Sequence, residues 1–381
     1  MIHSDEHQKL ITIRHDLHKI AELSGSEFQT QTYIRNQLRL LPSPPTISTI
    51  ADSGIIACFN SHIPGPSVLL RADMDALPIQ ELAQHCYVSM TPGVSHLCGH
   101  DGHTTSLLGV ARLLSRKPIS RGAVWLLFQP AEETGQGAQA VITELQQKNI
   151  KLDYVFAYHN LPGYPLGQLV IRENSFTAAV QSIAIQLHGQ TAHAAEPESG
   201  NCPAWVIEKL INFAKQFSNN CIKYKAFRLI TPICIKMGEP AYGTMPGNAE
   251  IHFTLRCFGN RSMDELSNQF IEYFSAICSE YQISFDYQWL DIFRACDNHQ
   301  ESVALLEMAG RRLEMSIMYP SEPFKWGEDF GCFTENFQGA MFGLGAGEGH
   351  SALHHVDYDY PDSLLLPSVK LFELLTRQIC C

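Results

Sequence analysis

The stretch VLLRADMD, residues 68–75, decides the fold class, because a short apolar run leads directly into two closely spaced carboxylates. Two similar apolar runs follow at 123–128 and 154–158, and segments with helical spacing lie between them at 104–115 and 138–147. Such an alternation of buried strands and helices is typical of a mainly parallel sheet covered by helices on both faces. The sequence therefore predicts an α/β domain of this kind.

The pattern changes between residues 176 and 292. Helical spacing occurs at 204–217 and 263–278, and strand-like spacing of apolar residues precedes it at Val180, Ile183, Ile185 and Leu187. At ~150 residues per domain, a chain of 381 residues corresponds to two or three domains. We therefore expect a smaller α+β domain, residues 176–292, inserted into a larger domain formed by residues 1–175 and 293–381.

The composition excludes several classes of protein. Hydrophobic residues make up 45% of the chain and charged residues 17%, which is ordinary for a folded protein. The 39 acidic residues outnumber the 27 Lys and Arg, giving a formal charge of −12 that disfavours general binding to nucleic acid or anionic membranes. No apolar stretch approaches the ~20 residues needed to cross a bilayer, and the N-terminus does not resemble a secretory signal. We therefore expect a cytoplasmic protein.

The spacing of the cysteines predicts the state of their thiols. All 12 are scattered without C-x-x-C spacing, so we expect reduced, individually buried thiols and not a disulfide framework or a redox centre. One of them, Cys98, lies in the stretch HLCGHDGH, residues 96–103, among several of the 17 histidines. This thiol is the candidate for a chemical role.

Metal-type ligands follow the predicted strands. Ligands bind beyond the carboxyl ends of the strands in open α/β sheets, so the residues after each apolar run are the ones that matter. These residues include Asp73, Glu132, Glu133 and His159, and a further histidine cluster lies at 350–355. Taken singly, a histidine at a strand end is more often a hydrogen-bonded residue, and adjacent glutamates stabilise a helix N-terminus. Their coincidence at successive strand ends favours a metal site.

The donor set indicates which metal. A thiolate, imidazoles and a carboxylate suit Zn²⁺, and also Mn²⁺, Co²⁺ or Ni²⁺, whereas Ca²⁺ and Mg²⁺ prefer oxygen ligands. Gly99 permits the turn that aims both Cys98 and His100 inward. Because Glu132 and Glu133 are adjacent, their carboxylates point differently and can divide metal binding and proton transfer between them.

Several motifs together resemble one known family along nearly the whole chain. The family is that of the metal-dependent amidohydrolases of the zinc metallopeptidases, which include bacterial aminoacylases, hippurate hydrolase and the plant auxin-conjugate hydrolases. The motifs that carry the resemblance are RHDLH (14–18), RADMDALPI (71–79), HLCGHDGHT (96–104), FQPAEETGQGA (128–138), HNLPG (159–163), GQTAHAAEP (189–197), GEDF (327–330) and LHHVDYD (353–359).

The resemblance implies a centre of two divalent metal ions. In the family pattern Cys98 bridges the ions, and the other ligands are His100, Glu133, His159 and His354. We choose His354 over His355 because the family's ligand immediately follows the apolar residue that Leu353 matches. The resemblance also implies that Glu132 is the general base, that Asp73 supports the ligands, and that Asp101 and His103 orient their loop.

The resemblance assigns roles in the inserted domain as well. It implies that His193 reaches the active site, often across a dimer interface, and stabilises the oxyanion of the tetrahedral intermediate. Arg256 is a candidate for holding a substrate carboxylate through paired hydrogen bonds. The inserted domain would then be both lid and dimerisation surface, and the protein a homodimer.

The expected activity is hydrolysis of the amide bond in an N-acyl amino acid or a similar small conjugate, releasing a carboxylic acid and a free amino acid. A dipeptidase or carboxypeptidase using the same two-metal centre is an alternative that the sequence does not separate from a deacylase. A metal-binding protein without catalysis is a further alternative, but the intact pair of Glu132 and Glu133 argues against it.

Overall fold

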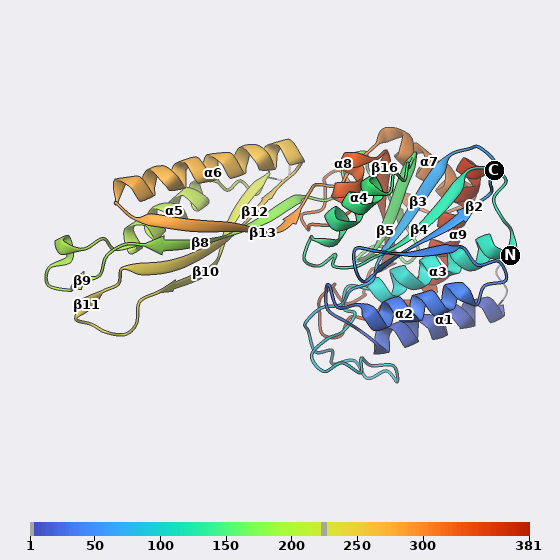
Figure 1. Ribbon diagram of the computed structural model, residues 1–381, viewed down its shortest axis with the longest axis horizontal. Helices are drawn as coiled ribbons and strands as arrows, with labels where there is room; N and C mark the ends of the chain where they lie inside the picture. The colour runs from blue at the N-terminus through green and yellow to red at the C-terminus, as the bar shows by residue number, and fades with distance from the viewer. Residues whose placement is uncertain (1–3, 222–226) are drawn as a thin grey trace. The chain divides into compact units, whose positions relative to one another are not determined.

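The computed structural model describes residues 4–221 and 227–381. The chain forms two compact units (Figure 1). The first consists of Met1–Phe176, Cys296–Ser321 and Glu328–Cys381, and the second of Thr177–Ala295 and Glu322–Gly327. The chain therefore leaves the first unit after Phe176 and returns to it at Cys296.

The first unit is built on an eight-stranded sheet. Its strands lie in the order β1 (Thr46–Ile50), β2 (Gly54–Asn60), β4 (Ala123–Gln129), β3 (Ser67–Asp73), β5 (Tyr154–Pro162), β16 (Gly339–Gly347), β6 (Leu169–Val170) and β15 (Ile317–Met318). The central strands β4, β3, β5 and β16 are parallel, and so are β6 and β15. The predicted α/β fold with a mainly parallel sheet is confirmed.

The antiparallel hairpin of β1 and β2 at one edge of this sheet was not predicted. Its turn uses Ala51 and Asp52, which have positive φ angles of 45° and 60°. A turn of this backbone shape usually carries Gly or Asn, so the sequence lacks the usual hairpin signal. Strand β1 also alternates weakly, because only Ile50 is buried.

Helices cover both faces of the sheet. On one face the apolar sides of α1 (Ser4–Lys19), α2 (Phe28–Arg39), α3 (His100–Arg116), α7 (Gln300–Arg312) and α9 (Leu365–Cys380) share one core with the strands. Helices α4 (Gly137–Gln147) and α8 (Gly331–Asn336) pack against each other and against strands β4 and β16 (Figure 1). Gly109 of α3 permits close packing, because a Cβ there would lie 2.5 Å from Cγ2 of Val369.

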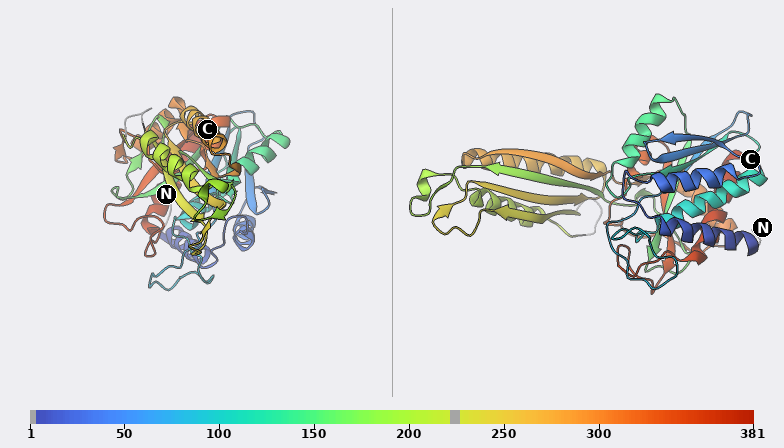
Figure 2. Two further views of the ribbon diagram at one scale, coloured as in Figure 1. Left: turned by 90° about the vertical axis from the view of Figure 1, so that its left-hand side faces the viewer. Right: turned by 60° about the horizontal axis from the view of Figure 1, so that its bottom comes forward.

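The second unit is an α+β domain with a four-stranded antiparallel sheet. The strand order is β10 (Arg228–Met237), β12 (Asn248–Cys257), β8 (Ala179–His188) and β13 (Ser284–Phe293). Helices α5 (Ala204–Phe217) and α6 (Asn260–Glu280) pack on this sheet and on each other (Figure 2). A separate ribbon pairs β9 (Ala192–His193) with β11 (Thr244–Met245).

Short elements complete the chain. Strands β7 (Asn174–Ser175) and β14 (Asp297–Asn298) pair where the chain leaves and re-enters the first unit, and 3₁₀ turns occupy Pro197–Ser199 and Asp362–Leu364. None of the described helices combines the length and the apolar character required to cross a bilayer. The prediction of individually buried thiols is wrong for Cys86, Cys221 and Cys381, which are exposed, and for Cys202 and Cys234, which are partly exposed.

Candidate metal centre

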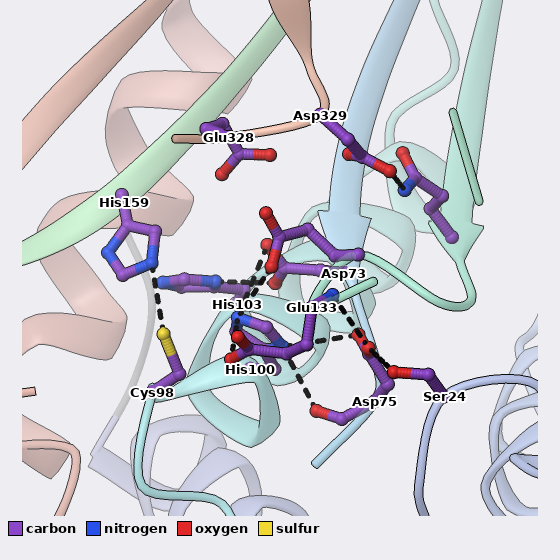
Figure 3. Close-up of polar contacts among 12 residues, drawn as sticks. Ser24, Asp73, Asp75, Cys98, His100, His103, Glu133, His159, Glu328 and Asp329 are labelled. Carbon is purple, nitrogen blue, oxygen red and sulfur yellow. Dashed lines mark hydrogen bonds and ion pairs between the residues drawn. The ribbon is translucent and has the colours of Figure 1, made fainter. Parts of the chain in front are cut away.

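The predicted ligands gather at the carboxyl ends of four neighbouring strands. Asp73 is the last residue of β3, the Glu132 and Glu133 pair follows β4, His159 lies in β5, and His354 follows β16. Because these strands are parallel, their carboxyl ends meet at one edge of the sheet. Figure 3 shows several of these side chains pointing toward one another.

Cys98 and His100 enter the site through a tight turn at the start of α3. Gly99 between them has φ of +92°, a conformation that costs a residue with a side chain more than it costs glycine. A Cβ at this position would also lie 2.7 Å from Oδ1 of Asn160. The turn therefore needs glycine, and it places the Cys98 Sγ 3.4 Å from Nε2 of His159.

Two overlapping groups of ligand atoms emerge from this packing. The ligand atoms of Cys98, His100 and His159 lie within 4.8 Å of one another, and so do those of Cys98, Glu133 and His354. The thiol belongs to both groups, and His100 and Glu133 form a further group with Glu132. Nε2 of His354 lies 3.7 Å from Oε1 of Glu133, whereas Nδ1 of His355 lies 3.7 Å from Oδ2 of Asp357, and both histidines are exposed.

The buried polar atoms of the site fit a divalent cation. Nε2 of His100 and Oε1 of Glu133 are buried and have no hydrogen-bond partner within the described part of the chain. A buried polar atom without a partner costs about 1–3 kcal/mol, and two such atoms in one place suit the coordination of a cation. Nδ1 of His100 lies 2.9 Å from the carbonyl oxygen of Asp75, which fixes the ring so that Nε2 faces the site.

The pKa shifts of the site's carboxylates also fit a divalent cation. Burial, together with Glu328 and Glu133, raises the pKa of Glu132 well above its ordinary value. Burial also raises the pKa of Glu133 to about 7, although the neighbouring His100 opposes this shift. Carboxylates crowded in a buried site repel one another, and a divalent cation among them would favour their ionised forms.

Asp73 is held from two sides. Nδ1 of His103 lies 2.6 Å from its Oδ1, and Nη1 of Arg71 donates a 2.6 Å hydrogen bond to its Oδ2. The fully buried Arg71 also donates to Glu328 at 2.9 Å and to Asp329 at 2.8 Å. Burial would raise the pKa of Asp73, but His100, His103 and Arg71 together outweigh it and lower the pKa well below its ordinary value.

Several of these supporting residues were not predicted from the sequence. Arg71 and the Glu328 and Asp329 pair lie in the motifs that carry the family resemblance, but no role followed from their positions alone. Asp75 is another: its Oδ2 accepts hydrogen bonds from Ser24 Oγ at 2.7 Å and from the backbone N–H of Glu133 at 3.0 Å (Figure 3). Asp75 therefore fixes the backbone that presents Glu133.

His193 and Arg256 lie in the second unit. His193 is exposed in β9, and its Nδ1 accepts a 3.1 Å hydrogen bond from the backbone N–H of Ala195. Arg256 lies in β12, and its Nη1 donates to the carbonyl oxygen of Lys325 at 2.9 Å. The roles that the resemblance implies for these two residues at the metal centre stay predictions.

A buried thiol, imidazoles and carboxylates at the carboxyl edge of a parallel sheet form a site of the metallohydrolase type. The model of peptidase family M20/M25/M40 matches residues 69–378, and the chain belongs to this family. This confirms the resemblance drawn from the sequence motifs.

Named relatives and a solved structure cover almost the whole chain. An N-acetyl-L-cysteine deacetylase of Bacillus subtilis is 30% identical over 97% of this chain and 88% of its own length. A hippurate hydrolase of Campylobacter jejuni is 27% identical over 95% of this chain and 94% of its own length. The crystal structure of a dinuclear metal-binding peptidase of Bacillus subtilis, 26% identical, superposes with a TM-score of 0.82 over 98% of both chains.

Proposed function

We propose that this protein hydrolyses the amide bond of small N-acyl amino acids by means of two divalent metal ions. The observation that carries the proposal is the buried ligand cluster around Cys98, with unpartnered ligand atoms on His100 and Glu133 and a second carboxylate, Glu132, beside them. The names of the relatives, a deacetylase and a hippurate hydrolase, support an acylated amino acid as the substrate class.

The residues that would hold the ions are those of the two overlapping groups, with the thiol of Cys98 common to both. The ligands are Cys98, His100, Glu133, His159 and His354. Ions of the Zn²⁺, Mn²⁺, Co²⁺ or Ni²⁺ class suit this donor set, and they would supply Lewis-acid polarisation of the scissile carbonyl and acidify a water molecule.

Glu132 would act as the general base. Its Oε2 lies 3.9 Å from Nε2 of His100, so its carboxylate borders the ligand cluster. It takes a proton from the attacking water and returns it to the leaving nitrogen as the carbon–nitrogen bond breaks, which yields a carboxylic acid and a free amine. Asp73, clamped by Arg71 and His103, would keep the neighbouring ligands in place.

The second unit would complete the active site. In this proposal His193 stabilises the negative charge that develops on the carbonyl oxygen, and Arg256 pairs with the carboxylate of the amino-acid substrate. The unit would serve as the lid and as the surface through which two copies form a homodimer. The support for these roles is the family membership together with the exposure of His193.

The pair of adjacent glutamates provides a sharp test. Replacing Glu132 with Gln should leave the metal content nearly unchanged and lower turnover of an N-acyl amino acid by roughly 10²–10⁴-fold, because only proton transfer is removed. The matched variant Glu133→Gln should lower the metal content as well. Both quantities are measured on the purified protein, and near-normal turnover by Glu132→Gln would contradict the proposed base.

A substrate screen tests the reaction itself. N-acetyl, N-benzoyl and longer-chain acyl amino acids are offered alongside dipeptides, and release of the free amino acid is followed before and after chelation and after readdition of Zn²⁺, Mn²⁺ or Co²⁺. We expect metal-dependent hydrolysis of at least one acyl amino acid. Hydrolysis of dipeptides alone would replace the deacylase assignment with that of a dipeptidase.

A further inference from the structure

A second group of metal-type ligands lies outside the centre around Cys98. One ligand atom from each of His18, Glu81 and His85 lies within 4.8 Å of the other two. His18 is in the last turn of α1, and the other two belong to the segment 74–99, which joins β3 to α3. Oε2 of Glu81 is hydrogen-bonded to Nε2 of His18 at 3.2 Å and lies 3.4 Å from Nε2 of His85.

His18 and Glu81 are each oriented by a hydrogen bond on the side away from the group. Nδ1 of His18 lies 2.8 Å from Oδ2 of Asp101, the arrangement in which a carboxylate orients an imidazole toward a metal. Oε1 of Glu81 accepts a 2.5 Å hydrogen bond from the backbone N–H of Ser89, which leaves Oε2 to face the two rings. The ligand atoms are therefore pre-arranged.

His85 gives the strongest support for a metal site in this group. Its ring stacks on that of Tyr87 with 3.8 Å between centroids, and neither of its buried ring nitrogens has a hydrogen-bond partner in the described structure. A polar ring held rigidly by stacking, with its nitrogen close to a carboxylate and no hydrogen bond formed, is placed as a metal ligand would be.

The charges around the group favour a cation. The carboxylates of Glu81, Asp101, Asp359 and Asp362 all contact the residues of this region, and one guanidinium, that of Arg14, bonds to the last three. Before any imidazole takes up a proton, these groups carry a net negative charge. A divalent cation placed among them would be attracted electrostatically.

We propose that His18, Glu81 and His85 form an additional divalent-cation site, suited to Zn²⁺, that fastens the segment 74–99 to helix α1. Two imidazoles and one carboxylate are a common zinc ligand set, with a fourth position open to water. The described part of this segment contains no helix or strand, yet its two ends carry Asp75 and Cys98 of the main centre. The site thus supports the main centre from outside, and binding there does not depend on the proposed hydrolysis.

Tyr87 offers a matched pair of variants. His85 stacks on one face of its ring, and His15 must take the other, with 3.6 Å between centroids. His85→Phe keeps an aromatic ring on Tyr87 but removes the ligand nitrogen. His15→Phe makes the same exchange on the opposite face, at a histidine outside the ligand group that pairs with Asp362.

The test counts metal in the full-length protein. Wild type and both variants are saturated with Zn²⁺, freed of unbound metal, and analysed for zinc per chain. We expect His85→Phe to retain one zinc ion fewer than wild type and His15→Phe to retain as many as wild type. Equal zinc content in wild type and His85→Phe would overturn the proposal, as would equal losses in the two variants.

Two further measurements guard against misfolding and against effects at the main centre. Glu81→Gln keeps an oxygen for the Ser89 N–H and should also lose one ion, so it replaces His85→Phe if that variant does not fold. Zn²⁺ should slow protease cleavage within residues 80–90 of wild type more than in His85→Phe, since only wild type would fasten this segment. If the zinc protection is equal in the two proteins, the fastening role is wrong.

Discussion

The two units of the molecule differ in what they bury. The first unit buries many polar and ionisable side chains, among them Arg71, Asp73, His100, Glu132 and Asp329. Within the described part of the second unit, Thr177 is the one polar side chain that is buried to this degree. Buried charges add little to stability even when they are well paired, so their concentration in one unit indicates a chemical purpose.

The second unit folds around an apolar core, as most domains do. Its core consists of apolar side chains such as Ile185, Leu210, Phe253 and Phe270. From Ala249 to Cys257 of β12 the residues alternate between buried and partly exposed positions, as expected for a strand with one face on helices. The first unit therefore buries the polar groups of a site together with their hydrogen-bond partners, whereas the second unit buries apolar side chains away from water.

The largest expected effect is that of metal removal. Chelation should abolish hydrolysis, and amide hydrogen exchange should accelerate at the start of α3 and in the segment 74–99, because the ligands there lose their common partner. Exchange in β12 of the second unit should stay unchanged. Equal acceleration in both units would break the contrast, because it would make the metal a requirement for the whole fold.

Replacement of Arg71 by Met should destabilise the protein by about 3–5 kcal/mol, because Asp73, Glu328 and Asp329 would be left buried without their cation. The control is Arg261→Met in the second unit, where the exposed side chain pairs with Glu265. The control should leave the free energy of unfolding unchanged within about 0.5 kcal/mol. Urea unfolding measures both, and equal effects would remove the distinction between the two kinds of charge.

Replacement of Leu210 by Ala should destabilise the second unit by about 2–5 kcal/mol, because the fully buried side chain would leave a cavity in an apolar core. The metal content of the purified variant should equal that of wild type. A variant that folds but has lost its metal would show that the core of the second unit does influence the site.

The smallest effect expected concerns Glu6 of α1, which bonds to Arg112 and Arg116 of α3. Burial would raise the pKa of Glu6, but these hydrogen bonds outweigh it and lower the pKa below 4.5. The carboxylate therefore stabilises the fold above about pH 4.5, and this contribution is lost as the pH falls through the lowered pKa. Glu6→Gln should lower stability by less than ~1 kcal/mol at pH 7, with the difference from wild type shrinking at acid pH. Thermal melts across this pH range measure the difference, and a constant difference would assign it to packing.

Several strands of both units could be predicted from the sequence. The apolar runs before Asp73, Glu132 and His159 predicted the parallel strands, and topology then explains why residues far apart in the chain meet at one edge. The alternation in residues 180–187 predicted a strand of the second unit in the same way. Periodicity is a local property, and these elements are visible in it.

The partners of buried charges could not be predicted in this way. Arg71 bonds to Glu328 and Asp329 across more than 250 residues of sequence, and nothing in either stretch specifies the pairing. The same holds for His18 and His85, whose proximity depends on how an irregular segment packs on a helix. Such contacts follow from the tertiary fold, which the local pattern does not encode.

The interruption of the first unit by the second has a consequence for synthesis on the ribosome. His100 leaves the ribosome roughly 250 residues before His354. At roughly 5–20 residues per second this is a delay on the order of 10–50 seconds. During that time the nascent chain can complete the second unit, while the first still lacks strand β16 of its sheet and the proposed ligand His354. A metal ion captured early would meet an incomplete set of the proposed donors, so correct loading would have to wait until His354 has been synthesised.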